Sequence, residues 1–360
     1  MIPYYLLIIL PFYFATVEYS MLSTQGVLLK KGKSNNSIVV FFVIWGLMLS
    51  LRHISCGTDL WNYENMFYRT FKLDFGEIFE YYTMEKIYYL FNWLVAQIYP
   101  DFRLFLIVVA ALCVGITGWF YWKESKSPSL TILLFVTNAC FPMFYSGLRQ
   151  SLAMLFVIPA YYLTKQKKIV PFIVLVLIAM QFHTSAIIMF LLYPIFHIPL
   201  QSKYFVLILL LVAVFFIFKK QLFYVAVPFL GEKHANATII QTNGYSVWLM
   251  FLAFLAYAFA IPDNCRITSE IIGLRNILVL MTLIQGFAPI NPLAMRMNYY
   301  FILLFPIIIP KIMSVSKEKY VNLVQFSKWA MLIFLTFMFF YNGHTREFTL
   351  GVYPYRAYWE

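Results

Sequence analysis

Long apolar runs recur from one end of this 360-residue chain to the other. Such runs must be buried in lipid or in protein, yet only 12% of the residues are charged, whereas a water-soluble domain has roughly 25%. The chain therefore cannot cover a soluble globule of its size. Because continuous apolar runs form helices in a bilayer, the sequence predicts an all-α polytopic integral membrane protein, with a single multi-pass transmembrane domain over residues 1–360.

The apolar runs predict about 12 transmembrane helices. The predicted spans are 3–22, 38–51, 103–122, 129–145, 149–164, 169–182, 184–199, 204–218, 245–262, 272–289, 299–313 and 328–342. Several are shorter than the roughly 20 residues that a straight helix needs to cross a bilayer, so we expect helices that either extend into the flanking aromatic residues or are broken. Residues 52–102 and 219–244 are predicted to be extracytoplasmic. Within 52–102, the run 84–99 (MEKIYYLFNWLVAQIY) is amphipathic and predicts an interfacial or re-entrant helix.

The basic residues divide by type between the two faces of this arrangement. Thirteen of the 18 lysines lie on one face, and seven of the nine arginines lie on the other. The positive-inside rule predicts that the lysine-rich face is cytoplasmic. No basic run with interleaved aromatic residues is present, so the net charge of +12 indicates topology rather than nucleic-acid binding. Since arginine grips phosphate through paired hydrogen bonds, the arginine-rich outer face indicates an anionic ligand.

Five short polar motifs end on this arginine-rich face. They are RHISCGTDLWNY with Arg52, Thr58, Asp59 and Tyr63; MEK with Glu85; YSGLRQSLA with Arg149 and Gln150; MQFHTSAI with His183; and NPLAMRMNYYF with Arg296 and Tyr299. Each has a simpler interpretation. Arginines at span ends reach lipid headgroups, Asp59 caps a helix, Glu85 favours a helix N-terminus, and His183 is a satisfied polar residue. Their placement on one face favours a shared site.

Motifs for nucleotides, metals and acyl transfer are absent from the sequence. The chain has no Walker loop, dinucleotide fingerprint, HExxH or GxSxG motif. Its four cysteines form neither a metal-binding nor a disulfide pattern. We therefore predict no cofactor and no metal, so the energy for any reaction would come from the substrate.

In their order and spacing, the polar motifs resemble those of the EpsG family of bacterial exopolysaccharide biosynthesis proteins, which is related to Wzy-type polymerases. The resemblance covers residues 38–310. Its matching positions are Arg52, Gly57-Thr58-Asp59 and Tyr63; Glu85; Arg149-Gln150 with Ala153; His183 with Ser185-Ala186; and Arg296 with Tyr299. The resemblance implies a GT-C-like polymerase architecture in the bacterial plasma (inner) membrane, with an active site that faces the periplasm or the cell exterior.

The resemblance also implies a metal-independent membrane glycosyltransferase that makes exopolysaccharide, capsule or O-antigen. Its substrates would be undecaprenyl-diphosphate-linked oligosaccharide and the growing polysaccharide, and its partners a chain-length regulator and a flippase of the same pathway. The predicted diphosphate ligands are Arg52, Arg149 and Arg296; the predicted groups that orient or deprotonate the acceptor are Asp59, Glu85 and His183; the other predicted substrate-binding residues are Thr58, Tyr63, Gln150 and Tyr299. Trp61 is a further ring for stacking on sugars.

Other functions stay open at this point. A flippase or transporter for lipid-linked sugars would need charges near the bilayer midplane and inverted repeats, and the sequence shows few such charges and no evident repeat. A transferase using a monophosphate-linked sugar would need acidic pairs in an early outer loop, which only Asp59 and Glu64 approach. An acyltransferase would have His183 as its sole candidate base. A non-catalytic assembly partner is a further alternative.

Overall fold

A computed structural model of the chain is helical throughout the residues that it describes. These are residues 2–25, 35–138, 140–226, 245–345 and 350–360. Within these ranges no β-strand forms, and extended backbone pairs only in two isolated bridges, Arg52 with Ala357 and Pro262 with Ser316. The predicted all-α class is therefore confirmed.

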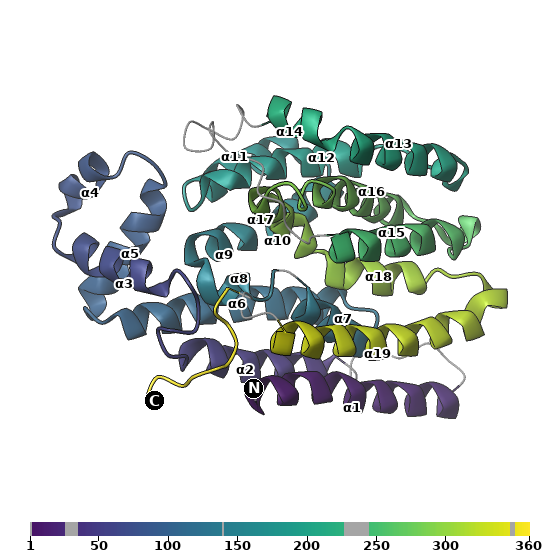
Figure 1. Cartoon of the computed structure of the whole chain (residues 1–360), viewed down its shortest axis with the longest axis horizontal. Coiled ribbons are helices and arrows are strands. Elements are labelled where there is room, and N and C mark those ends of the chain that lie inside the picture. The colour runs from purple at the N-terminus through teal and green to yellow at the C-terminus, as the bar shows by residue number, and fades with distance from the viewer. Residues whose placement is uncertain (1, 26–34, 139, 227–244, 346–349) are drawn as a thin grey trace.

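Most helices run nearly parallel to the long axis of the molecule, while three short ones gather at one end (Figure 1). These three are α3 (Leu60–Phe71), α4 (Phe75–Tyr81) and α5 (Lys86–Ile98), and we call this the α3–α5 end. The other α-helices are α1 (Ile2–Gln25), α2 (Asn36–Ser50), α6 (Phe102–Glu124), α7 (Pro128–Thr137), α8 (Met143–Ser146), α9 (Leu148–Leu155), α10 (Val157–Lys165), α11 (Ile169–Met180), α12 (Leu192–Phe196), α13 (Phe205–Ile217), α14 (Lys219–Ala226), α15 (Tyr245–Ala260), α16 (Ser269–Gln285), α17 (Pro292–Ile302), α18 (Phe305–Met313) and α19 (Val321–Thr345). The 3₁₀ helices are η1 (Thr184–Leu191), η2 (Ser202–Tyr204), η5 (Asn264–Arg266) and η6 (Glu318–Tyr320).

The amphipathic run 84–99 forms α5, as the sequence predicts. Its buried residues recur at the three- and four-residue spacing of one helix face, as Tyr88, Asn92 and Val95 illustrate. The helix packs against α3, α4 and α6, so α3–α5 form a small lobe on the end of the bundle. The interfacial or re-entrant position of this helix stays a prediction.

In the described part of the chain, two pairs of apolar helices are bent, which agrees with one of the two alternatives that the short apolar runs left open. Among the described residues, α6 and the stretch Glu318–Tyr341 are each long and apolar enough to cross a bilayer. Two bent pairs of helices raise this number to four if each is one span: Ser202–Ile217 with Lys219–Val225, bent by 73°, and Met295–Ile302 with Phe305–Met313, bent by 49°. The chain is an integral membrane protein, while the total of about 12 spans stays a prediction.

Proline accounts for one of these breaks. Pro306 occupies the first turn of α18, where its missing N–H costs nothing, but it cannot continue the hydrogen bonding of α17. The predicted extracytoplasmic loop 219–244 begins with α14, and its remaining residues, 227–244, lie outside the described ranges.

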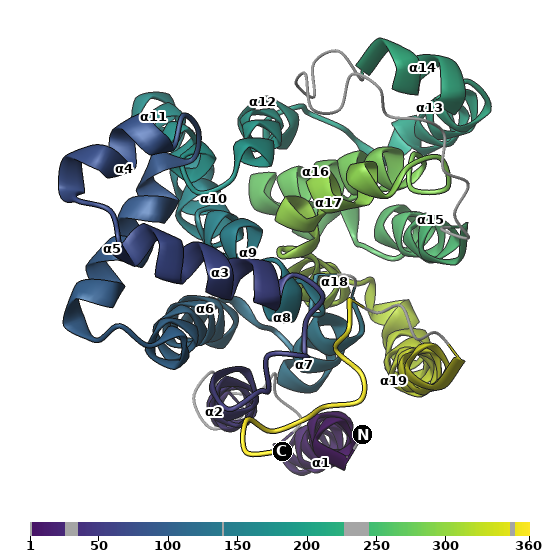
Figure 2. The ribbon, with the colours of Figure 1, turned by 60° about the vertical axis from the view of Figure 1, so that its left-hand side comes forward.

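The C-terminal segment returns to the α3–α5 end and pairs with the polar segment that follows α2. The His53 N–H donates to the Arg356 carbonyl (2.8 Å), and the Thr58 N–H donates to the Leu350 carbonyl (3.0 Å). At the other terminus, the Tyr4 hydroxyl donates to the Val352 carbonyl over 2.8 Å. Both termini therefore lie near this end of the molecule (Figures 1 and 2).

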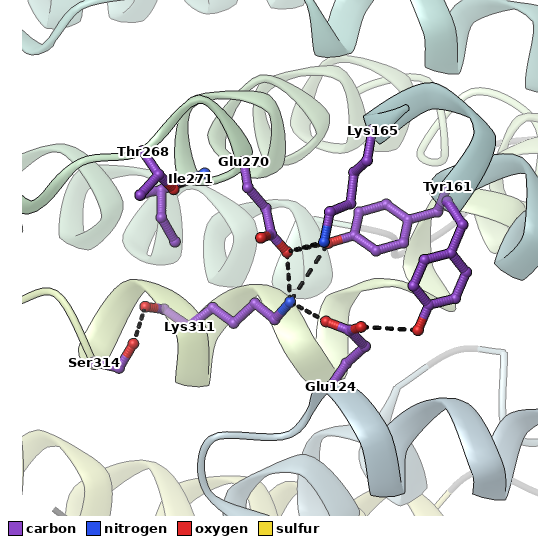
Figure 3. A network of polar contacts seen from close by, with 9 residues as sticks. Glu124, Tyr161, Lys165, Thr268, Glu270, Ile271, Lys311 and Ser314 are labelled. Atoms are coloured by element: carbon purple, nitrogen blue, oxygen red, sulfur yellow. Dashed lines mark hydrogen bonds and ion pairs between the residues drawn. The ribbon is translucent and has the colours of Figure 1, made fainter. Parts of the chain in front are cut away.

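A buried ion-pair network ties four helices together at the opposite end (Figure 3). Lys311 of α18 donates to Glu124 of α6 and, over 2.6 Å, to Glu270 of α16. Glu270 also pairs with Lys165 of α10 at 2.9 Å and accepts the Tyr161 hydroxyl at 2.5 Å. Only 7% of the Lys311 side chain is exposed, so its charge depends on these partners. The sequence analysis did not single out this network.

Candidate functional site

The segment Tyr145–Gln150 joins the separate polar motifs, and we call it the junction segment. It contains the break between α8 and α9, with Gly147 between the two helices. Its side chains contact three of the other four motifs directly and reach the fourth, around His183, through Glu85. Residues that are far apart in the sequence are thereby brought together at the α3–α5 end.

Arg52 is buried against the junction segment. Its guanidinium carbon lies 5.7 Å from the ring centroid of Tyr145, and its Nη1 donates to the carbonyl of Leu49. The residue is 1% exposed, and its Nε and Nη2 have no hydrogen-bond partner among the described residues. Arg52 therefore packs behind the site in this structure, and its role as a diphosphate ligand stays a prediction.

The Gly57-Thr58-Asp59 turn lies against Ser146. The Thr58 and Ser146 hydroxyl oxygens are 2.8 Å apart, and the Asp59 N–H donates to Ser146 Oγ over 3.3 Å. Ser146 in turn donates to the Asp59 carboxylate over 3.4 Å. Asp59 directly precedes α3, yet its side chain makes no capping hydrogen bond. Its carboxylate is therefore not used as the helix cap that the simpler interpretation expects.

A shielded ion pair joins Glu85 to Arg149. Glu85 Oε2 lies 2.5 Å from Arg149 Nη1, and Glu85 Oε1 accepts the backbone N–H of Thr184 over 2.9 Å. The Glu85 side chain is 9% exposed and that of Arg149 is 29% exposed. Both carboxylate oxygens are thus occupied, and Glu85 holds the start of α5, α9 and η1 in one place.

Tyrosine rings surround Arg149. Its guanidinium carbon lies 5.8 Å from the ring centroid of Tyr63 and 6.0 Å from that of Tyr88. Burial raises the pKa of Tyr63, although the nearby charge of Arg149 partly lowers it, so the phenol stays neutral at physiological pH. Because these rings keep water from one side of the guanidinium, they strengthen its attraction for an anion.

Gln150 connects the junction segment to α17. Its Nε2 donates to the backbone carbonyl of Arg296 over 2.6 Å, and the residue is 1% exposed. The side chain of Arg296 itself is exposed, so its guanidinium is open to a ligand. Tyr299 is 2% exposed, which makes it part of the core at this position rather than of an open surface.

His183 caps η1 and orders one wall of the site. Its Nδ1 accepts the Ser185 N–H over 3.3 Å and lies 2.6 Å from the Ser185 hydroxyl oxygen. That hydroxyl lies 2.9 Å from the hydroxyl of Tyr300. This geometry agrees with the simpler interpretation of His183 as a satisfied polar residue, and it holds the Thr184 N–H against Glu85.

Four residues that the sequence analysis left out complete the cluster: Ser146, Tyr88, Thr184 and Tyr300. Ser146 and Thr184 had a signal in the sequence, because each stands in the same motif as a predicted site residue. Tyr300 had the same signal, because it follows Tyr299 in the motif with Arg296, whereas Tyr88 had none, since the chain has 27 tyrosines and only packing distinguishes those that face the site.

Taken together, the cluster offers a guanidinium held by a carboxylate, a second exposed guanidinium, and a carboxylate on a turn. The guanidiniums of Arg149 and Arg296 suit an anion, and Asp59 can accept a proton. Among the described residues, no three His, Cys, Asp or Glu side chains gather closely enough to hold a metal ion.

Comparison with known proteins matches residues 35–357 of the chain to the model of the EpsG family. No curated protein and no solved structure gives a match. The matched range includes every predicted site residue, and it extends past the resemblance at 38–310 to take in α19 and most of the C-terminal segment.

Proposed function

Because the chain belongs to the EpsG family, we propose that this membrane protein is a polysaccharide polymerase. It transfers a growing glycan from undecaprenyl diphosphate to a second lipid-linked repeat unit on the outer leaflet of the bacterial plasma membrane. The α3–α5 end then faces the cell exterior or periplasm, and the lysine-rich opposite end faces the cytoplasm. The observation that carries this proposal is the convergence of the five polar motifs on the junction segment.

Convergence favours a shared site over independent membrane anchors. Arginines that only reached lipid headgroups would need no contact with one another's motifs. Here Glu85 binds Arg149 and the Thr184 N–H, and Gln150 binds the backbone of Arg296. These interactions fix the Arg149 side chain on Glu85 and hold the backbone at Thr184 and Arg296 against the same segment, and a substrate bound by several motifs requires such positioning.

In this proposal the diphosphate is both the group that the arginines bind and the leaving group. Arg149 and Arg296 bind its oxygens and stabilise the charge that develops on it as the glycosidic bond breaks. Glu85 holds Arg149 in place for this task. Arg52 is buried against Tyr145 in this structure, and its Nε and Nη2 have no hydrogen-bond partner among the described residues, so it stays the predicted third ligand of the diphosphate.

Asp59 is the base in this scheme. The acceptor hydroxyl attacks the anomeric carbon of the growing glycan, the bond from that carbon to the diphosphate oxygen breaks with its electron pair, and the hydroxyl proton passes to Asp59. Glu85 is less suitable because both of its oxygens are occupied. Since Nδ1 of His183 binds Ser185, the role of His183 is to hold the start of η1 in place, where the Thr184 N–H donates to Glu85.

Polymer synthesis in a matched deletion strain tests the proposal. Arg149→Lys and Arg296→Lys keep the charge but remove the planar fork, so each should lower the polymer yield by at least about tenfold, equivalent to roughly 1.4 kcal/mol. Arg266→Lys is the control, because Arg266 pairs with Glu318 on the opposite end. Protein levels are matched by immunoblot. Near-wild-type polymer from both Arg149→Lys and Arg296→Lys would refute two-point binding of the diphosphate.

A further inference from the structure

Helix α3 has a buried face that fixes it on the end of the bundle. Leu60, Tyr63, Phe67 and Thr70 are buried, at the spacing of one helix face. This face packs against α5 and α6. In Figure 2, α3 lies across the ends of the bundle helices rather than alongside them. Its opposite face therefore looks away from the bundle.

The exposed face of α3 carries an unusual set of side chains, which we call the α3 stripe. Its members, all exposed, are Trp61, Asn62, Asn65, Tyr68 and Arg69. Offsets of one, four, seven and eight residues from Trp61 place them within one third of the helix circumference. Trp61 is 56% exposed and Tyr68 is 38% exposed, so large rings stand in the open beside amides and a guanidinium.

This composition fits a carbohydrate better than it fits lipid. A helix face that inserts into a membrane interface presents Trp, Phe and Leu and keeps its polar residues on the opposite face, whereas the α3 stripe sets its two rings among two amides and a guanidinium on the same face. The neighbouring helix α4 shows the contrast, because its exposed Phe75 and Phe79 rings pack on each other with centroids 5.5 Å apart. Aromatic faces stack on the C–H faces of sugar rings, while amide and guanidinium groups hydrogen-bond to pairs of hydroxyls.

The α3 stripe is continuous with the proposed reaction site. Asp59 immediately precedes α3, and Trp61 and Asn62 follow it in the first turn. At the far end of the helix, Arg69 Nη1 donates to the Tyr81 hydroxyl over 3.5 Å, which steadies the guanidinium at the end of the stripe. A glycan that leaves the site along α3 would therefore meet two rings and three polar side chains in succession.

We propose that the α3 stripe is an oligosaccharide-binding surface that holds the acceptor or the growing glycan beside Asp59. This inference rests on the proposed polymerase function, since it takes its ligand from that reaction. The rings of Trp61 and Tyr68 supply the affinity, and Asn62, Asn65 and Arg69 supply hydrogen bonds to hydroxyls. Substrates with several sugars beyond the reacting one gain most from this surface.

Direct binding tests the surface without catalysis. The probe is a set of fluorescently labelled fragments, one to four repeat units long, of the polysaccharide made by the protein's own strain. Fluorescence polarisation measures their Kd for the purified protein in nanodiscs. Trp61→Ala and Tyr68→Ala should each raise the Kd by about tenfold for the longer fragments. Tyr68→Phe should bind as wild type, because it keeps the ring. Phe75→Ala, on α4, should also bind as wild type.

Three outcomes would overturn the α3 stripe as a glycan surface. They are an unchanged Kd in both alanine variants, an equal loss of affinity in Phe75→Ala, and no measurable binding of any fragment by the wild-type protein. Failure of the polymerase proposal has a different signature. Wild-type protein would then make no chains from lipid-linked units, whatever its affinity for fragments. Arg149→Lys should lower chain formation by at least about tenfold, as above, and still bind the fragments with wild-type Kd, because the fragments carry no diphosphate for Arg149 to bind.

Discussion

At the residue scale, the turn before Asp59 requires a glycine at position 57. The φ of Gly57 is +136°, a conformation that residues with a Cβ rarely adopt, and an added Cβ would lie 2.4 Å from the carbonyl oxygen of Tyr145. The turn can therefore press Thr58 and Asp59 against Ser146 only because position 57 has no side chain.

Replacing Gly57 by alanine should disturb the site. We expect Gly57→Ala to cost about 1–3 kcal/mol from backbone strain and contact with Tyr145, and to reduce polymer synthesis further by displacing Asp59. Gly76→Ala is the control, because a Cβ there meets nothing within 4 Å, and alanine in a helix is favoured by up to about 1 kcal/mol. Thermal unfolding in detergent and polymer yield check both variants. Equal behaviour of the two would show that the turn does not depend on glycine.

A double-mutant cycle should show strong coupling between Glu85 and Arg149. The pair is shielded, so removing one partner leaves an uncompensated charge, and we expect a coupling energy of at least about 1 kcal/mol from Glu85→Gln and Arg149→Gln. The exposed pair Arg266–Glu318, with side chains 48% and 83% exposed, is the control and should give no more than about 1 kcal/mol. Unfolding of all variants in the same detergent supplies the free energies. A smaller coupling for Glu85 than for Glu318 would contradict the structure.

The sequence predicted part of this residue-scale geometry. The motifs themselves marked Asp59, Glu85 and Arg149, because charged residues at the ends of apolar runs are conspicuous. The pairing of Glu85 with Arg149 was not predictable, since 64 positions separate them and only the packing of α5 on the bundle brings them together. The burial of Arg52 was likewise not visible, because it depends on Tyr145 and on the C-terminal segment.

At the scale of elements, short and broken helices position the site. The interruption at Gly147 between α8 and α9 lets Ser146, Arg149 and Gln150 reach different neighbours. Short apolar runs predicted that helices would either extend into flanking aromatic residues or be broken, because runs under about 20 residues do not span a bilayer. The run lengths did not give the direction of each bend, which depends on contacts between helices.

The ion-pair network around Lys311 should hold α6, α10, α16 and α18 together away from the α3–α5 end. Replacing Lys311 with methionine leaves Glu124 and Glu270 without their shared cation, and breaking such a buried pair costs about 3–5 kcal/mol. We expect a clearly lower Tm for Lys311→Met by differential scanning fluorimetry. Lys126→Met is the control, because Lys126 is exposed on the same end and its replacement should change stability by no more than about 0.5 kcal/mol. A Tm as high as that of the control would mean that the network does not stabilise the bundle.

At the scale of the whole molecule, the bundle separates two kinds of charge. The ion-pair network of two lysines and two glutamates (Figure 3) lies away from the α3–α5 end, and the cluster around Arg149 lies at that end. The distribution of lysine and arginine along the sequence predicts that the lysine-rich side is cytoplasmic, and this orientation stays a prediction. The sequence did not predict that the C-terminal segment would pair with residues 51–58, because the 11 residues 350–360 are too few to show a hydrophobic period or a motif.

Cysteine labelling in intact cells tests the orientation. Of the native cysteines, three are buried and Cys265, near the opposite end, is exposed. In a Cys265→Ser background, a membrane-impermeant maleimide should label Glu80→Cys on α4 and should spare Gln166→Cys until the cells are permeabilised. Both positions are exposed in the structure, so accessibility within the fold does not separate them. The reverse pattern would place the candidate site in the cytoplasm.

Reconstitution tests the central claim most directly. Purified protein in liposomes is given lipid-linked repeat units isolated from a strain that lacks the polymerase, and the products are separated by gel electrophoresis. The wild-type protein should convert single units into a ladder of longer chains with release of undecaprenyl diphosphate, and Asp59→Asn should make none. If the wild-type protein leaves the units unjoined, the polymerase proposal is wrong, and if it also moves them across the bilayer, a transporter of lipid-linked sugars takes its place.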